Sequence, residues 1–256
     1  MKTGVASFLL IVLSTGTVLT LSSCVSTGKK GKKTPGIEDP ASIPGPPPLP
    51  TSVGTQDSYS KVNTTQPFLA LTFDDGPHAT NTPRLLDLLK ARNVKATFFV
   101  VATNAKRYPE IMRRIVAEGH EIGNHTGTHT ALTKMSDSAI RQELTSSHEA
   151  IQSITGVAPR TMRPPYGAIT ATQKSWIRRE FGYPAILWSV DPEDWKKPGP
   201  SVVTSRLVSG AKPGGILLVH DIHSASIDAM PSTIDQLLAK GFQFVTVTQL
   251  IAMDGK

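Results

Sequence analysis

Apolar and charged positions divide the chain into three stretches of different character. Residues 5–21 carry no charged side chain, residues 25–66 are rich in Pro, Gly and Lys, and residues 67–256 alternate short apolar runs with amphipathic segments. Short continuous apolar runs are typical of strands buried on both faces, whereas apolar residues spaced three or four apart predict helices. The folded domain is therefore expected at residues 67–256.

The apolar runs of this domain predict seven strands joined by helices. The predicted strands are residues 68–73, 96–101, 120–123, 160–162, 185–190, 215–219 and 242–247. The predicted helices are residues 82–89, 109–118, 136–154 with Ser136 as the cap, 172–181, 201–208, 228–239 and a short last one at 250–251. Strict alternation of strand and helix indicates a parallel sheet covered by helices.

Seven or eight such units in a domain of this length favour an α/β fold, namely a small and distorted (β/α)7-8 barrel. An open, doubly wound sheet that binds a dinucleotide is the alternative. It is disfavoured because the first strand is not followed by the G-x-G-x-x-G turn that such sheets use. We therefore expect a single barrel domain.

Residues 1–24 have the pattern of an export signal. Lys2 precedes the uncharged run, which ends in Leu21-Ser22-Ser23-Cys24 and resembles a bacterial lipobox, in which the cysteine is lipidated. Because Cys24 is the only cysteine, we expect a lipoprotein-type signal peptide and a membrane anchor through Cys24. A signal that is simply cleaved and a transmembrane anchor are the alternatives. Val25 after the cysteine favours the outer membrane if the cell is Gram-negative.

Residues 25–66 are predicted to be a linker. The stretch 43–50 is dominated by Pro, cannot pack a core and favours an extended, semi-rigid spacer. The Lys cluster at residues 29–33 either contacts anionic lipid headgroups or is a solvated part of the tether.

Charge and cysteine content exclude several classes of protein. The net charge of +7 is divided between residues 1–66, at +3, and residues 67–256, at +4. A domain that is only mildly basic is not expected to bind nucleic acid. The single cysteine excludes an intramolecular disulfide and a cysteine-based zinc site.

Ionisable residues gather where the predicted strands end. Barrel enzymes place their active sites on loops at the carboxyl ends of the strands. The segments that follow the first, third, fourth, fifth and sixth predicted strands are Asp74-Asp75-Gly76-Pro77, His125 to His129, Arg163 to Tyr166, Asp191 to Trp195 and His220 to His223. The sequence therefore predicts one site at this end of the barrel.

His125 and His129 predict a metal site when they are combined with a carboxylate from another strand. Catalytic zinc is held by three protein ligands and keeps a fourth position open. Asp74 and Asp75 are adjacent in extended chain, so their side chains diverge, and one can reach the ion while the other faces the attacking water. We expect one divalent ion, with zinc as the first choice and cobalt, nickel and manganese as alternatives.

The remaining polar residues at this end suggest proton transfer. His220 is the natural general acid, with a satisfied core histidine as the alternative. Arg163 and Asp194 are expected to set the protonation of the catalytic groups, and a structural ion pair is the alternative. Trp195 is a candidate for stacking on a sugar.

Three further residues near the predicted site have no assigned role. Trp188 is predicted to be a core residue because of its place in a strand. Asp221 and His223 either support the catalytic residues or are solvated.

Five ordered motifs resemble those of the polysaccharide deacetylases of carbohydrate esterase family 4, the NodB-like enzymes. Each motif alone is weak, but five in order across residues 68–247 are specific. They are Thr72-Phe-Asp-Asp-Gly-Pro77, His125-x-x-x-His129, Arg163-Pro-Pro-Tyr166, Asp191-x-x-Asp194-Trp195 and Leu218-Val-His220.

The resemblance implies a distorted (β/α) barrel and metal-dependent removal of acetyl groups from N-acetylglucosamine polymers. It also implies a role for each matching residue. The implied metal ligands are Asp75, His125 and His129, the general base is Asp74 held by Arg163, the general acid is His220 tuned by Asp194, and the oxyanion donor is the backbone N–H of Tyr166. Tyr166 is thereby a predicted substrate contact, beside Trp195, which is predicted from its aromatic side chain.

An exported, tethered enzyme of this family is expected to act on an acetylated glycan of the cell envelope. Peptidoglycan is the first choice. Chitin oligosaccharides, exopolysaccharide and O-acetylated xylan are the alternative substrates, and a metal-free glycan-binding protein is the alternative class. We expect a monomer.

Overall fold

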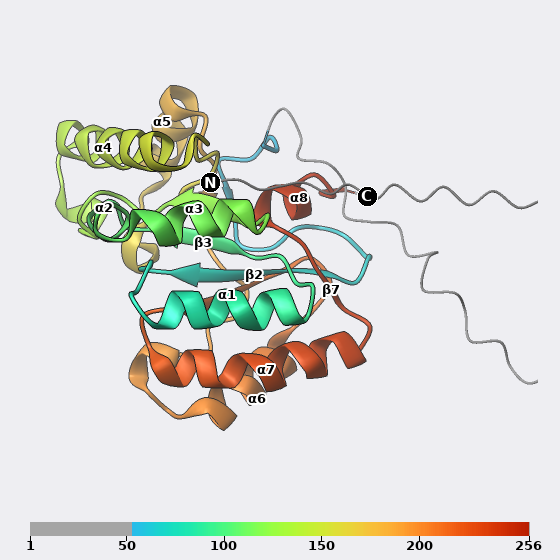
Figure 1. Cartoon of the computed structure of the whole chain (residues 1–256). Helices are drawn as coiled ribbons and strands as arrows, with labels where there is room; N and C mark the ends of the chain where they lie inside the picture. The colour runs from blue at the N-terminus through green and yellow to red at the C-terminus, as the bar shows by residue number, and fades with distance from the viewer. Residues whose placement is uncertain (1–52, 256) are drawn as a thin grey trace, which may run out of the picture. The chain divides into compact units, whose positions relative to one another are not determined.

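The computed structural model describes residues 53–255 (Figure 1). The predicted signal peptide, with Cys24, and residues 25–52 of the predicted linker lie outside the described residues. Within residues 53–255, none of the helices is both long and apolar enough to cross a membrane.

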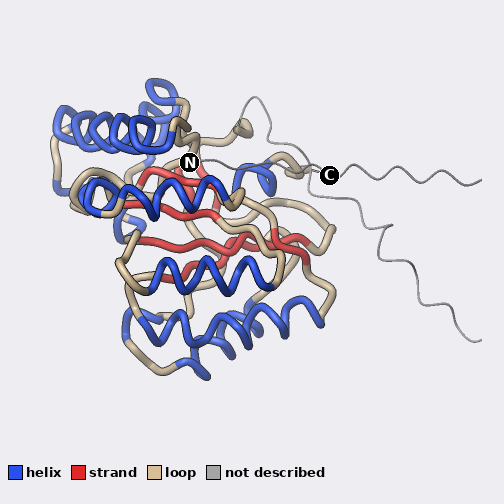
Figure 2. Tube along the Cα trace, in the orientation of Figure 1, coloured by secondary structure: helices blue, strands red, loops and turns tan. Residues whose placement is uncertain are grey.

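Parallel strands form the centre of the domain, as predicted (Figures 1 and 2). The sheet runs in the order β4–β3–β2–β6, and β7 pairs with the start of β2. The strand bounds are Phe68–Asp74 for β2, Thr97–Val100 for β3, Glu121–Asn124 for β4, Gly215–His220 for β6 and Gln243–Phe244 for β7.

Single parallel bridges close this sheet into a ring. Met162 bridges Asn124 of β4 on one side and Ala185 of β5 (Ala185–Ile186) on the other, and Val190 bridges Leu217 of β6. The predicted strands 160–162 and 185–190 are therefore present only as bridges and a two-residue strand. The predicted distorted barrel is confirmed, and its distortion lies on this side.

The predicted helices cover the outside of the strands, except the last one, which packs at the amino ends of the strands (Figures 1 and 2). Their bounds are Asn81–Ala91 for α1, Pro109–Ala117 for α3, Asp137–Thr155 for α4, Ala171–Phe181 for α5, Pro200–Gly210 for α6, Ser224–Ala239 for α7 and Val247–Ile251 for α8. Ser136 caps α4 as predicted, because its hydroxyl accepts the backbone N–H of Ala139. The short helix α2 (Ala102–Arg107) was not predicted, since one and a half turns carry too little periodicity to detect.

Part of the predicted linker belongs to the domain. Within residues 53–66, strand β1 (Ser58–Tyr59) pairs in parallel with β5. Tyr59 and Val62 are each only 2% exposed and pack in one cluster with Val53 and with residues of α8. These apolar residues are scattered among polar ones and find their partners far along the chain, so local patterning does not detect them. The domain boundary therefore lies no later than Val53 instead of at residue 67.

The alternation of β2 separates two cores. Its residues Leu69, Leu71 and Phe73 pack with the surrounding helices, whereas Ala70 packs in the barrel interior, which α8 closes at the amino ends of the strands. The next residues on the inner face are Thr72 and Asp74, which are polar and buried. The barrel interior thus changes from apolar to polar toward the carboxyl ends of the strands.

Candidate active site

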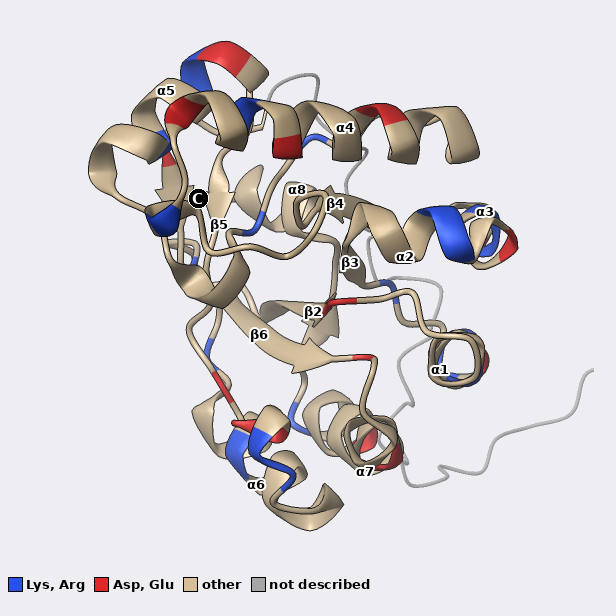
Figure 3. Cartoon of the chain, turned by 90° about the vertical axis from the view of Figure 1, so that its left-hand side faces the viewer, with Lys and Arg blue, Asp and Glu red and all other residues tan. Residues whose placement is uncertain are grey.

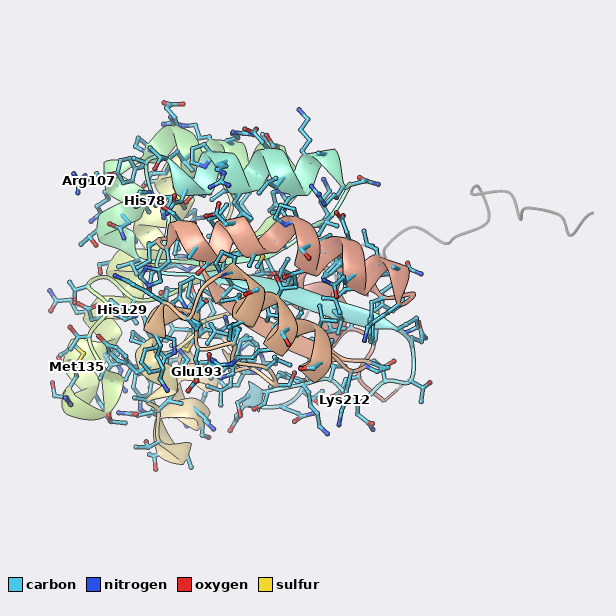
Figure 4. All side chains as sticks on the ribbon, turned by 90° about the horizontal axis from the view of Figure 1, so that it is seen from below. His78, Arg107, His129, Met135, Glu193 and Lys212 are labelled. Atoms are coloured by element: carbon cyan, nitrogen blue, oxygen red, sulfur yellow. The ribbon has the colours of Figure 1, made fainter. Side chains whose placement is uncertain are left out.

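The carboxyl ends of the strands surround a pocket of about 360 Å³. Figure 3 looks onto this end of the barrel, where β2 ends in an acidic tip near the centre. In Figure 4, His129 and Glu193 lie toward this end and Lys212, which precedes β6, lies at the other. The residues that line the pocket are Asp74, Asp75, His125, His129, Tyr166, Trp188, Asp191, Trp195, Leu218, His220 and His223. Each of the five predicted motifs contributes at least one residue to the lining of this pocket. Arg163 and Asp194 do not line it and are buried.

Asp75, His125 and His129 offer three ligand atoms that lie within 4.8 Å of one another. Asp75 Oδ1 is 3.0 Å from His129 Nε2 and 3.4 Å from His125 Nε2, and this buried oxygen has no other donor among the described residues. Burial raises the pKa of Asp75, but the hydrogen bonds and charges of the two histidines outweigh it and hold that pKa well below its ordinary value. Two imidazole nitrogens and a carboxylate oxygen fit a divalent ion of the zinc type.

The orientation of His125 supports this fit. Its Nδ1–H donates to the backbone carbonyl of Arg163 over 2.7 Å, so Nε2, which faces Asp75, is the ring nitrogen that remains to bind an ion. Metal-binding histidines are commonly oriented in this way by a second hydrogen bond.

The loops of the site hold non-glycine residues in the left-handed backbone region. The φ angles are +74° at Asp75, +68° at Thr126, +62° at His129 and +60° at Tyr166. Each such residue costs on the order of 1–3 kcal/mol and persists only where its surroundings determine it. Asn124 accepts the N–H of Thr126, and the Thr126 hydroxyl in turn accepts the N–H of His129. Local hydrogen bonds therefore aim the histidine loop at the pocket.

Asp74 and Arg163 form a buried ion pair inside the barrel. One Arg163 nitrogen donates to Asp74 Oδ1 and to the Thr72 hydroxyl, each over 2.7 Å, and the other nitrogens donate to the backbone carbonyls of residues 186 and 187. Burial lowers the pKa of Arg163, and the charge of Asp74 opposes this shift. Since Arg163 takes Oδ1, the second oxygen of Asp74 remains available toward the pocket, 3.8 Å from His125 Nε2.

His220 and Asp194 form the second charged pair. Asp194 accepts the Nδ1–H of His220 at 2.8 Å, the backbone N–H of His220 at 2.9 Å and the hydroxyl of Ser226 at 2.5 Å. Burial alone would lower the pKa of His220, but the bond to Asp194 and the charge of Asp74 raise it to about 9. His220 is therefore protonated at neutral pH and presents its other ring nitrogen as a proton donor.

Two aromatic residues stand exposed at the pocket. Tyr166 is 71% exposed and packs edge-on against His129, and its backbone N–H has no acceptor among residues 53–255. Trp195 is half exposed, and the Lys196 ammonium lies 4.9 Å from its ring centroid. Both side chains can contact a substrate.

Three residues near the site differ from or extend the sequence-based expectations. Trp188 lines the pocket and is not a core residue; it lies two residues after Ile186, so the alternation of a strand places it on the same inner face. His223 also lines the pocket. Asp221 is fully buried, and burial raises its pKa to about 7 against the hydrogen bond from Thr82.

The distorted parallel barrel and its Asp-His-His set define the class: an α/β barrel with a group of side chains that could hold a divalent ion, at the end where barrel enzymes carry out their chemistry. A family model for polysaccharide deacetylases matches residues 61–186. The chain belongs to this polysaccharide deacetylase family, carbohydrate esterase family 4, which is a family of hydrolases.

Individual relatives agree with this assignment. The chain is 39% identical over 228 residues to the peptidoglycan-N-acetylglucosamine deacetylase PgdA of Listeria monocytogenes, with 82% of this chain and 48% of that protein covered. It is 39% identical over 189 residues to the peptidoglycan-N-acetylmuramic acid deacetylase PdaC of Bacillus subtilis, with 74% and 40% covered. The chain thus spans about half the length of these curated relatives or less.

A solved structure of T48 deacetylase with substrate has the same fold. Its TM-score to this chain is 0.70 at 44% identity, and the match covers 74% of this chain and 93% of that one.

Proposed function

We propose that this protein is a metal-dependent hydrolase that removes N-acetyl groups from N-acetylglucosamine residues of peptidoglycan. The observation that carries the proposal is the composition of one pocket. It combines a three-ligand set with a carboxylate and a protonated histidine, each fixed by its own buried partner.

Proton transfers can be assigned to atoms of the chain. Asp74 Oδ2, which Arg163 leaves free, accepts a proton from the attacking water, and His220 donates a proton to the leaving amine. The backbone N–H of Tyr166 donates to the oxyanion that forms at the acetyl carbon. A divalent ion held by Asp75, His125 and His129 supplies Lewis acidity toward the acetamide oxygen and the water. Zinc is our first choice for this ion.

The names of the relatives support peptidoglycan as the substrate but differ in the sugar, which is N-acetylglucosamine for one and N-acetylmuramic acid for the other. The test is acetate release by the purified domain with a divalent ion on peptidoglycan, chitohexaose and acetylxylan. We expect the highest kcat/KM on peptidoglycan. Faster release from chitohexaose or acetylxylan would reject this substrate, and glycan binding with no acetate release would indicate the inactive glycan-binding alternative.

We also propose that the protein is exported and held at the membrane by lipid on Cys24. The support is the lipobox-like ending of the first 24 residues. Replacing Cys24→Ser is expected to move the protein from the membrane fraction to the soluble one. Retention in the membrane at unprocessed mass would instead indicate a transmembrane anchor.

A further inference from the structure

Asp221 is a buried carboxylate to which the proton transfers above give no role. It follows His220 directly, is 0% exposed and does not line the pocket. Its Oδ2 accepts the hydroxyl of Thr82 at the start of α1, while Oδ1 has no hydrogen-bond partner among the described residues. A buried oxygen without a hydrogen-bond partner lowers the stability of the fold, so the burial of Asp221 needs a physical reason.

The Asp221 carboxylate lies against the loop that carries the metal ligand Asp75. A Cβ built on Gly76 would stand 2.4 Å from both carboxylate oxygens, so only glycine lets the loop approach this closely. Thr82, which donates to Asp221, also accepts the backbone N–H of His78 at 2.7 Å. Asp221 therefore joins the end of β6, the start of α1 and residues 76–78.

Asn104 holds the same loop through a separate contact. The side-chain amide of Asn104, on α2, donates to the backbone carbonyl of Asp75 over 2.8 Å. The N–H of Val101 donates to the next carbonyl, that of Gly76, over 3.1 Å. Both contacts hold carbonyls directly after the Cα of Asp75, which adopts a left-handed conformation with φ +74°.

We propose that Asn104 and Asp221 are positioning residues that clamp the Asp75 loop and thereby set the affinity of the site for a divalent ion. A left-handed aspartate relaxes unless its backbone is held from outside. If it relaxed, the Asp75 carboxylate would no longer face His125 and His129. The inference rests on the proposed metal site and concerns how tightly that site binds.

The direct test measures zinc affinity in the metal-free protein by competition with a chromophoric chelator. Asp221→Ala and Asn104→Ala are expected to raise the zinc Kd by roughly 10–100-fold, the usual effect of removing a group that orients a metal ligand. Asp221→Asn keeps the size of the side chain and the acceptor for Thr82, so its Kd is expected to stay within about threefold of the wild type.

Thr233→Ala is the matched control. Thr233 is also a fully buried polar residue, but within residues 53–255 its hydroxyl bonds only at the contact between α6 and α7, to Thr204 and to the carbonyl of Ala229. Its loss is expected to lower the melting temperature and leave the zinc Kd unchanged. Acetate release at saturating zinc provides a second measurement and is expected to recover most of its rate in Asp221→Ala.

Folded variants Asp221→Ala and Asn104→Ala that bind zinc like the wild type would overturn the inference. So would an equal loss of affinity in Thr233→Ala. If Asp221→Ala does not fold, Asn104→Ala decides, because Asn104 is only half-buried and alanine favours the helix there. A wild type that binds none of zinc, cobalt, nickel and manganese would reject the proposed metal site itself, whereas normal wild-type binding with unaffected variants rejects only the clamp.

Discussion

The two sides of the pocket are built on different principles. On the ligand side, Asp75, His125 and His129 direct two imidazole nitrogens and a carboxylate oxygen at one point, on loops with left-handed residues. On the proton-donor side, Asp194 accepts three hydrogen bonds, from the ring and backbone of His220 and from Ser226. The ligand side is suited to binding a cation. On the proton-donor side, protein groups alone satisfy the charge and hydrogen-bonding groups of Asp194. The two sides should therefore respond differently to the same kind of mutation.

The largest difference is expected for His125→Ala. Removing one of three ligands should abolish both metal retention and acetate release, because two ligands do not hold the ion against water. Elemental analysis after dialysis and an acetate assay measure the two effects. His223→Ala, which removes a histidine from the same pocket outside the ligand set, is the control and should keep the ion. Full activity in a preparation free of metal would contradict the proposed function.

Loss of either proton-transfer group should leave the ion in place. Asp74→Asn cannot accept a proton at neutral pH, and His220→Ala cannot donate one. Each is expected to lower kcat by roughly 10²–10⁴, the usual contribution of a positioned acid or base. The metal content of both variants, measured by elemental analysis, should equal that of the wild type. Loss of the ion in His220→Ala would show that the two sides are not separate.

The pH dependence of kcat should identify the donor. His220 must be protonated to act, so the rate is expected to fall as pH rises through the pKa of His220, which is about 9 in the metal-free protein. Asp194→Asn removes a cause of the raised pKa and should move this alkaline limb to lower pH. Asp191→Asn, also at the pocket, should leave the limb where it is. An alkaline limb that persists unchanged in His220→Ala would exclude His220 and make His223 the next candidate.

The same pair should contribute to stability in a defined pH range. The folded pKa of His220, about 9, lies above its ordinary value of 6.5. The contribution of protonated His220 to the free energy of unfolding is therefore fully present below pH 6.5 and is lost as pH rises toward 9. Thermal melts of the metal-free wild type across this range, compared with His220→Ala, measure it: the difference in melting temperature should shrink with rising pH.

The smallest effect is expected at the exposed aromatic residue Trp195. Loss of a stacking partner should raise KM by roughly 2–10-fold while kcat and metal content stay close to the wild type. Trp195→Phe should recover most of the affinity, because the aromatic face is kept. A large fall in kcat in Trp195→Ala would mean that this loop positions Asp194 as well.

Much of this arrangement could be predicted from local patterns. The apolar run of β2 ends at Asp74, so the strand and the polar residue at its end are readable together. The parallel alternation then implies that the loops after successive strands meet at one end, which brings Asp75 near His125 and His129. The left-handed conformations of Asp75 and His129 were not predictable, because several distant contacts hold them.

Residues without a local signal were missed or misplaced. Trp188 resembles a core residue in a strand, and Tyr59 resembles part of a polar linker. Each takes its position from a partner distant in the sequence: the Trp188 ring lies near Arg163, and Tyr59 packs in the cluster closed by α8.

The sequence by itself determined the alternation of the main strands and helices, the end of the barrel where the polar residues gather, and the residue types available there, because hydrophobic periodicity and short motifs are local properties. Only the tertiary structure decided which atoms meet. It pairs Arg163 with one oxygen of Asp74, pairs His220 with Asp194 and places the Asp221 carboxylate against Gly76. These three pairings join residues that lie 89, 26 and 145 positions apart in the sequence (163 − 74, 220 − 194 and 221 − 76). They depend on closure of the barrel, and no local pattern encodes that closure.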